Sequence, residues 1–100
     1  MTKVHVTPRA LKDLDAIAFW TLRNWGEARM ENYLRALGVR FNWLAENPIR
    51  GRERGEVGNG YRSFPEGRHM VFYLVIPNGI AIIGVPHQAM DTASHFDGEP

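Results

Sequence analysis

Residues 60–87 decide the fold, and they read GYRSFPEGRHMVFYLVIPNGIAIIGVPH. Within them, Asn78–Gly79 is the dipeptide preferred in a two-residue type I′ turn, because both of its positions need positive φ. The dipeptide lies between runs rich in Val, Ile, Phe and Tyr, which are residues that favour strands. The stretch therefore predicts a β-hairpin in which Pro77 faces Ile80 across the turn.

The same pairing brings two histidines together at the open end of the hairpin. Met70 is expected to face His87, so His69 lies diagonally beside His87. We expect strands at residues 60–64, 68–76 and 80–86. The middle strand is predicted to be central in the sheet, because it is apolar at almost every position from Met70 onward.

The first half of the chain predicts one strand and two helices. Residues 3–6 alternate as a short strand does, and Thr7–Pro8 is a typical helix start because Thr caps free N–H groups and Pro fits the first helical position. Residues 24–26 end this helix, and a second one runs from about Glu27 to Asn47–Pro48. Apolar spacing predicts the buried faces, which are Leu11, Leu14, Ala18, Leu22 and Trp25 on the first helix and Met30, Leu34, Leu37, Phe41 and Leu44 on the second.

These elements predict an α+β fold with one domain at residues 1–100. The short connection between the helices favours an antiparallel helical hairpin. We expect the N-terminal strand to be followed by this hairpin, packed on a small antiparallel sheet that ends in a three-strand meander. Residues 92–100 have little apolar content, so we expect a flexible tail there.

Composition excludes several classes of function. The chain has no cysteine, and its four histidines lack close ligand spacing, so we expect no metal site. Glycine-rich phosphate loops are missing too, so we expect no cofactor. No apolar run is long enough to span a bilayer and no export signal is seen, which predicts a cytoplasmic protein away from membranes. A net charge of +1 does not favour direct, specific DNA binding by the chain alone.

Two groups of residues remain after the core is built. Large apolar side chains that fall outside the predicted core are typical of protein-binding surfaces, although they would also fit an enlarged core. They are Phe19, Trp20, Val39 and Trp43. Cationic and imidazole side chains gather at the strand ends, where they suit phosphate binding and acid–base chemistry as well as a plain surface role. They are Arg62, Arg68, His69 and His87.

Several short segments, in their order and spacing, carry a resemblance to a known family. They are Ala10–Ile17, Gly26 with Ala28, Asn47–Pro48 with Gly51, Tyr61–Arg62, Gly67–Tyr73 and Val85–Asp91. On these residues the chain resembles, along nearly its full length, the ParE branch of the RelE/ParE superfamily of bacterial toxins from type II toxin–antitoxin modules. It departs from many ParE-like sequences at Ala89, where an Arg is common.

The resemblance implies a toxin that inhibits DNA gyrase, blocks replication and is neutralised by a ParD-like antitoxin in a hetero-oligomeric complex. The antitoxin is then expected on Phe19, Trp20, Val39 and Trp43. Contact with the target is expected at Arg62, Arg68, His69, His87 and Met90. Related RelE-like members cut mRNA on the ribosome, which makes such an endoribonuclease the alternative, with Arg62, Arg68, His69 and His87 as its catalytic residues. The presence of only two lysines, Lys3 and Lys12, disfavours it.

Overall fold

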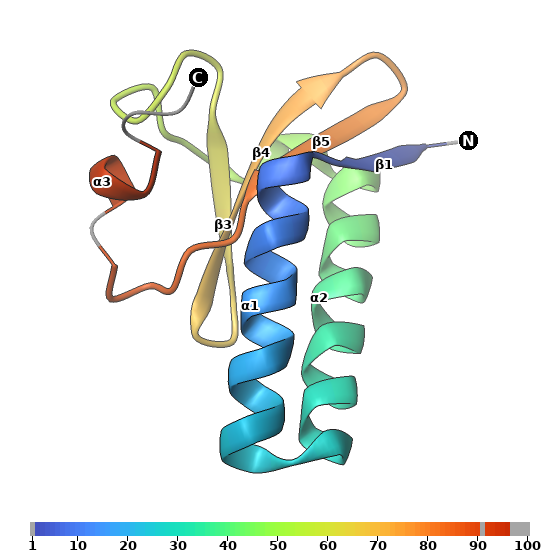
Figure 1. Ribbon diagram of the computed structural model, residues 1–100. Helices are drawn as coiled ribbons and strands as arrows, with labels where there is room; N and C mark the ends of the chain where they lie inside the picture. Colours follow the sequence, from blue (N-terminus) through green and yellow to red (C-terminus); the bar gives the residue numbers. More distant parts are fainter. Residues whose placement is uncertain (1, 91, 97–100) are drawn as a thin grey trace.

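Two long helices lie against one sheet in the computed structural model of this protein, which describes residues 2–90 and 92–96 (Figure 1). The elements are β1 (Lys3–Val6), α1 (Pro8–Trp25), α2 (Glu27–Glu46), η1 (Pro48–Arg50), β2 (Arg52–Glu53), β3 (Arg62–Glu66), β4 (His69–Ile76), β5 (Gly79–Gly84) and α3 (Thr92–Phe96). The strand order β1-β5-β4-β3-β2 confirms the predicted α+β architecture and the central place of β4. The expected antiparallel pairing is wrong at one edge, because β1 pairs parallel to β5. No tight turn joins these two strands, so the local sequence does not fix their relative direction.

The turn of the hairpin is not the predicted type I′ turn. Val75 faces Ile80, so Pro77 and Asn78 occupy the centre of the turn. Asn78 has a φ of 67°, and Gly79 is not among the residues with positive φ. A proline followed by a residue with positive φ is the pattern of a type II turn. Pro77 fixes the φ that the first central position of that turn needs, and this preference overrides the Asn78–Gly79 signal.

Gly79 is required for the pairing of β1 with β5 and not for the conformation of the turn. A Cβ atom at this position would overlap the carbonyl oxygen of Lys3 in the neighbouring strand. The N–H of Lys3 donates a hydrogen bond to the carbonyl of Asn78 at 2.7 Å. Glycine therefore allows β1 to approach the start of β5 closely enough to extend the sheet.

After the different turn, a β-bulge is the second feature that moves the hairpin away from its predicted register. The pairing of β4 with β5 shifts between Phe72 and Tyr73. Beyond the shift His69, and not the predicted Met70, faces His87 in an antiparallel bridge. Neighbouring residues of a strand point to opposite faces, so a shift of one residue decides which side chains meet. The two histidines are therefore opposite one another instead of diagonal.

The helices cover the sheet with the predicted face of α2 and with only part of the predicted face of α1. Leu37, Phe41 and Leu44 of α2 are buried, as expected. The expected face of α1 is right at Leu14, which packs against the core, and wrong elsewhere, since the exposed fractions are 51% for Leu11, 43% for Leu22 and 51% for Trp25. Its buried residues are Ala10, Ile17 and Thr21. The hydroxyl of Thr21 donates to the carbonyl of Ile17 at 2.7 Å, which makes a polar residue acceptable on the buried face. Within the described residues no helix is long and apolar enough to cross a membrane.

Part of the predicted tail forms the short helix α3. The Phe96 ring packs at 5.1 Å from Phe72 and 5.6 Å from Tyr61, on the opposite side of β4 from the main core. Nε2 of His95 lies 3.0 Å from Oδ2 of Asp13 on α1. Residues 92–96 are thus helical and in contact with the sheet, while residues 97–100 lie outside the described residues. The flexibility of the tail stays a prediction.

The hydroxyl of Tyr73 ties the sheet to the segment after α2. Tyr73 is fully buried, accepts a hydrogen bond from the N–H of Gly51 at 2.8 Å and donates one to the carbonyl of Pro48 at 2.7 Å. Gly51 has to be small here, because a Cβ atom would overlap the Tyr73 ring. One phenol therefore satisfies two main-chain groups and holds η1 on the core.

We expect Tyr73→Phe to lower the free energy of unfolding by about 1–3 kcal/mol, because the change leaves the Gly51 N–H and the Pro48 carbonyl without their partner. Denaturant unfolding followed by circular dichroism measures the change. The matched control is Tyr61→Phe, since the Tyr61 hydroxyl makes no hydrogen bond within the described residues. The control should change stability by less than about 0.5 kcal/mol. Equal effects of the two variants would contradict the role of Tyr73.

Candidate functional site

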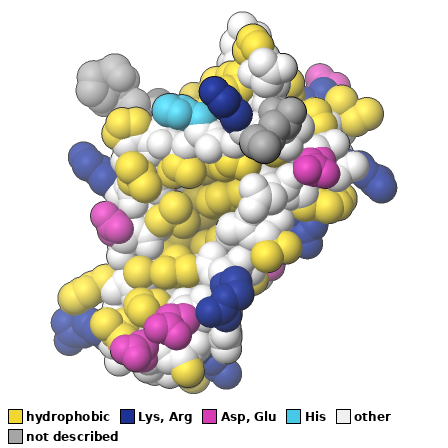
Figure 2. Space-filling view, turned by 90° about the vertical axis from the view of Figure 1, so that its right-hand side faces the viewer, with side chains coloured by type: hydrophobic (Ala, Val, Ile, Leu, Met, Phe, Trp, Pro, Cys, Tyr) yellow, Lys and Arg dark blue, Asp and Glu magenta, His cyan; other side chains and the backbone are white. Residues whose placement is uncertain are grey.

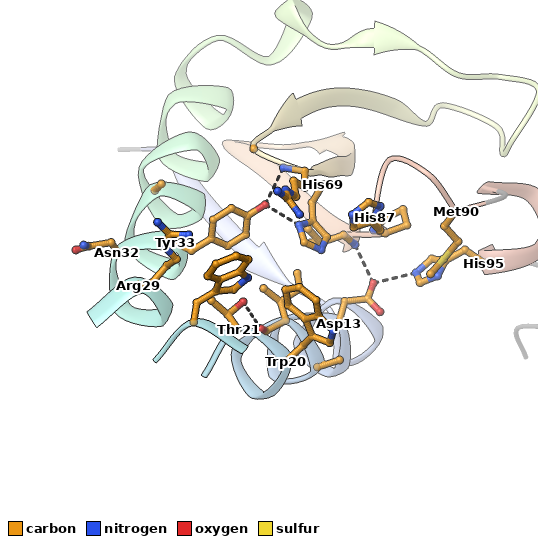
Figure 3. Close-up of a pocket in the computed structure, with 18 of the residues that line it drawn as sticks. Asp13, Trp20, Thr21, Arg29, Asn32, Tyr33, His69, His87, Met90 and His95 are labelled. Atoms are coloured by element: carbon orange, nitrogen blue, oxygen red, sulfur yellow. Dashed lines mark hydrogen bonds and ion pairs between the residues drawn. The ribbon is translucent and has the colours of Figure 1, made fainter. Parts of the chain in front are cut away.

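A groove of about 1070 Å³ lies between the helical hairpin and the end of the sheet that carries His69 and His87 (Figure 3). In Figure 1 the ends of α1 and α2 nearest their junction extend past β1 and β5, so these strands do not cover them. The apolar walls come from Ala16, Ile17 and Trp20 of α1, from Trp25 at its end and from Ala28 and Ala36 of α2. A groove of this size, apolar with a few polar groups at one end, suits a ligand or a protein segment.

Tyr33 of α2 organises the polar end of the groove. Its hydroxyl accepts a hydrogen bond from the N–H of Arg68 at 3.0 Å and lies 2.6 Å from Nδ1 of His69 and 3.3 Å from the carbonyl of Glu66. Gly67 has a φ of 58°, and a Cβ atom there would overlap the Tyr33 ring. The ring therefore packs directly on the turn between β3 and β4. Burial is the main reason why the pKa of the Tyr33 phenol is raised, so the phenol stays protonated.

His69 is a neutral imidazole at physiological pH. Burial, followed by the neighbouring His87, lowers the pKa of His69 from 6.5 to about 4. The two rings meet edge to face with their centroids 5.3 Å apart. The backbone N–H of Ala89 donates to Nδ1 of His87 at 3.0 Å. Both imidazoles are thus held in place through their Nδ1 atoms.

Asp13 of α1 fixes the segment that follows β5. Its Oδ2 atom accepts a hydrogen bond from the N–H of Val85 at 2.8 Å and lies 3.0 Å from Nε2 of His95. Figure 3 shows this carboxylate between the two partners at the edge of the groove. The segment carries His87 and Met90, which line the groove, so the contacts of Asp13 help to fix the position of this wall.

The structure brings together four of the five predicted target-binding residues. Arg68, His69, His87 and Met90 all line the groove. Arg62 lies elsewhere on β3, where its guanidinium donates to the carbonyl of Gly51 at 2.8 Å and lies 4.0 Å from Glu53. This arrangement gives Arg62 a role in holding the chain after η1. Asp91, which the family resemblance includes, lies outside the described residues.

Metal-ligating side chains do not gather in this groove. Among residues 2–90 and 92–96, no group of three or more His, Asp or Glu side chains could hold a metal ion. The imidazole, phenol and guanidinium groups suit hydrogen bonding to an acceptor instead.

The four predicted antitoxin-binding residues are spread over separate places. Trp20 lines the groove, whereas Val39 and Trp43 line a smaller hollow of about 500 Å³. Trp43 is only partly exposed, because its ring packs 5.1 Å from Phe64. Phe19 is 61% exposed and lies outside both hollows. Their role in binding stays a prediction.

The two hollows adjoin each other at α2. Both are lined by Asn32 and Ala36, so a chain that crosses the small side chain of Ala36 would pass from one hollow to the other. Figure 2, seen from the side on which α2 and the N-terminus lie, shows hydrophobic side chains gathered in the middle of this face with charged side chains around them. Exposed apolar surface of this kind is typical of proteins that bind a partner.

Sequence reasoning missed Tyr33 and misplaced Trp25. Tyr33 lies four residues before the buried Leu37, on the edge of the predicted core stripe, and a tyrosine there needs a partner for its hydroxyl. This need for a hydrogen-bond partner was the feature of the sequence that could have identified Tyr33 as a site residue. Trp25 was expected in the core but lines the groove at the end of α1, with the guanidinium of Arg29 4.7 Å from its ring centre.

Comparisons with known proteins agree on one family. The family model described as ParE toxin of type II toxin-antitoxin system, parDE, matches residues 4–92. The chain is 34% identical over 96 residues to Toxin ParE1 of Caulobacter vibrioides, covering 96% of this chain and 99% of that protein. It is 38% identical over 87 residues to Toxin ParE1 of Mycobacterium tuberculosis, covering 86% and 89%. A solved chain of the chromosomal ParDE TA system from P. aeruginosa has the same fold, with a TM-score of 0.72, 19% identity and coverage of 87% and 96%.

We expect His69 to make the folded chain sensitive to acid. Its pKa of about 4 lies below the ordinary 6.5. Between pH 4 and 6.5 the unfolded chain binds more protons than the folded chain, so the free energy of unfolding rises with pH. The contribution of His69 is fully present above the unfolded pKa of 6.5. It is lost as the pH falls through the folded pKa of about 4. Denaturant unfolding at pH 7 and at about pH 4.5 should show a smaller loss for His69→Gln than for the native chain.

The matched control for this measurement is His5→Gln, because His5 is exposed on β1. This variant should lose as much stability on acidification as the native chain. An equal loss in all three proteins would contradict the buried, neutral imidazole, and an NMR titration of His69 checks its pKa directly.

Proposed function

The chain belongs to the ParE family of toxins from type II toxin–antitoxin systems, and we propose that it arrests bacterial growth by binding DNA gyrase and so blocks replication. The observation that carries the proposal is the family match over residues 4–92. The fold alone would not select this function, because related folds carry different activities.

The geometry of the groove supports a binding protein rather than a ribonuclease. A general base works best with a pKa near the working pH, and the pKa of His69, lowered to about 4, makes it a weak base. Its Nδ1 atom is held by Tyr33. Arg68 and Arg29 are the only Arg or Lys residues that line the groove in the described part of the chain. Cleavage of mRNA would need stronger stabilisation of the negative charge on phosphate.

The apolar walls support a ParD-like antitoxin as the partner of the groove. The P. aeruginosa structure with the same fold comes from a ParDE system, and a toxin of this family is paired with an antitoxin. We propose that an antitoxin helix lies between Trp20 and Trp25 and that the segment after it crosses Ala36 to reach Val39 and Trp43. This is recognition of a helix in a groove, extended along α2 in a hetero-oligomeric complex.

Induction of the chain in bacteria tests the target. We expect early DNA breakage and filamentation while translation continues, and inhibition of supercoiling by purified gyrase. Pulse labelling during the first minutes measures protein synthesis, and DNA-damage staining over the same period measures DNA breakage. Immediate loss of translation with cleaved mRNA would overturn the proposal in favour of the ribosome-dependent endoribonuclease, and normal growth would overturn both.

We expect Trp20→Ala and Trp25→Ala each to weaken binding of the antitoxin by about 2 kcal/mol or more, because large aromatic side chains anchor helices in grooves. Titration calorimetry with the antitoxin measures the change, and both side chains are exposed enough to be replaced without loss of the fold. Phe19→Ala is the matched comparison, since Phe19 is exposed on the same helix outside the groove. A loss for Phe19→Ala as large as that for Trp20→Ala would place the antitoxin on the outer face of α1 instead.

A further inference from the structure

The polar end of the groove presents hydrogen-bond donors that have no acceptor in the described chain. The donors belong to His69, His87 and Arg68, and all three residues line the groove. Their state follows from the hydrogen bonds that the same residues make elsewhere.

We assign the proton of neutral His69 to Nε2. Nδ1 is 2.6 Å from the Tyr33 hydroxyl. An N–H donor rarely comes closer than about 2.7 Å to an oxygen, whereas an O–H donor does. The single Tyr33 proton has two acceptors within reach, Nδ1 of His69 at 2.6 Å and the carbonyl of Glu66 at 3.3 Å. We assign it to the shorter contact, which makes Nδ1 the acceptor and leaves Nε2–H of His69 as a donor.

The proton of His87 lies on the same ring atom. The backbone N–H of Ala89 donates to Nδ1 of His87 at 3.0 Å, so Nδ1 carries no proton. Nε2 of His87 is then a second N–H donor. Within the described residues, neither Nε2 atom accepts or donates a hydrogen bond.

Arg68 adds a positive charge beside the two imidazoles. Its backbone N–H is bound to Tyr33, while its guanidinium makes no hydrogen bond or ion pair with any described residue. Among the described residues, the carboxylates of Asp13 and Glu66 lie at this end, and both already have partners. Asp13 holds Val85 and His95, and Glu66 lies 2.8 Å from Arg40. No acceptor among the described residues reaches these donors, so they are open to a binding partner.

We propose that this end of the groove binds a carboxylate side chain presented by a helix of the antitoxin. The inference rests on the proposed function, because the antitoxin supplies the helix. A helical protein segment is favoured over a nucleic acid because Ala16, Trp20 and Ala36 make the neighbouring walls apolar and suit an amphipathic helix. Two N–H donors and a guanidinium suit one carboxylate.

The site predicts that binding strengthens as the pH falls from about 7 towards 5, since a bound carboxylate favours protonated His69. Several charged or titratable groups face His69 from the surrounding elements and set the size of this effect. They are Asp13 on α1, Tyr33 and Arg29 on α2, Glu66 and Arg68 at the β3–β4 turn, His87 after β5 and His95 on α3.

NMR of the full chain, labelled with ¹⁵N at histidine, tests the site with acetate and inorganic phosphate as probes. The free protein should show protons on Nε2 of both His69 and His87. Acetate should move both Nε2 resonances and raise the pKa of His69. No response to acetate would overturn the proposal, and a response to phosphate alone would replace the carboxylate by a nucleic-acid backbone.

A pair of amphipathic helical peptides tests the protein context. The two peptides are identical, with Leu and Ala on one face, except for a Glu or a Gln one helical turn from the central Leu. We expect the Glu peptide to bind about tenfold more tightly, because hydrogen bonds to charged groups are stronger than neutral ones. Equal binding of the two peptides would overturn the proposal.

Variants assign the preference to the proposed donors. Arg68→Met and His87→Ala should remove most of the preference for Glu, and Arg52→Met, which removes the same charge outside the groove, should keep it. Tyr33→Phe frees Nδ1 of His69 and should reduce the preference while its ring still packs on Gly67. A preference that survives Arg68→Met and His87→Ala together would overturn the site.

These measurements do not depend on growth arrest or on gyrase. A chain that leaves growth unaffected but prefers the Glu peptide would overturn the proposed function alone. Growth arrest together with equal peptide affinities would overturn the carboxylate site alone.

Discussion

The pairing of β4 with β5 is the constraint on which the rest of the structure depends. The turn at Pro77 and Asn78 starts the ladder, and the bulge at Phe72 and Tyr73 shifts it by one residue. Val71 and Tyr73 of β4 alternate into the core beneath the helices. The shift leaves Ile83 of β5 unmatched and brings His69 opposite His87. The pairing of these two strands therefore contributes to both the core and the polar end of the groove.

A single phenol then converts this arrangement into a site. Tyr33 reaches from α2 to the β3–β4 turn, and its hydroxyl contacts the main chain of Arg68 and the ring of His69. A half-buried hydroxyl needs partners, since an unsatisfied polar group costs free energy. The partners it finds order the turn and fix the tautomer of His69. The groove thus has an apolar part built by helix packing and a polar part built by hydrogen bonding.

Sequence patterns predicted those parts of the fold that depend on local spacing. The apolar stripe of α2 and the start of α1 at Thr7–Pro8 were predicted correctly, because periodicity and capping are local properties. The face of α1 was predicted only in part, since Leu14 packs on the core while Leu11 stays exposed and Thr21, whose hydroxyl bonds within the helix, is buried. Arg68, His69 and His87 were predicted as members of one group of site residues. Their position in the same groove as Trp20 depends on a bulge that no local sequence pattern predicted.

The meeting of Trp20 with Arg68 and His69 has a consequence for neutralisation. On the proposed function, one groove carries residues for the antitoxin and residues for the target. Allosteric control requires two distinct sites and a change of state between them, whereas a shared surface requires neither. An antitoxin helix that covers Trp20 and offers a carboxylate to Arg68 removes the target's contacts by occupying them. Neutralisation is then competition, and its strength follows from the concentration of antitoxin relative to its dissociation constant.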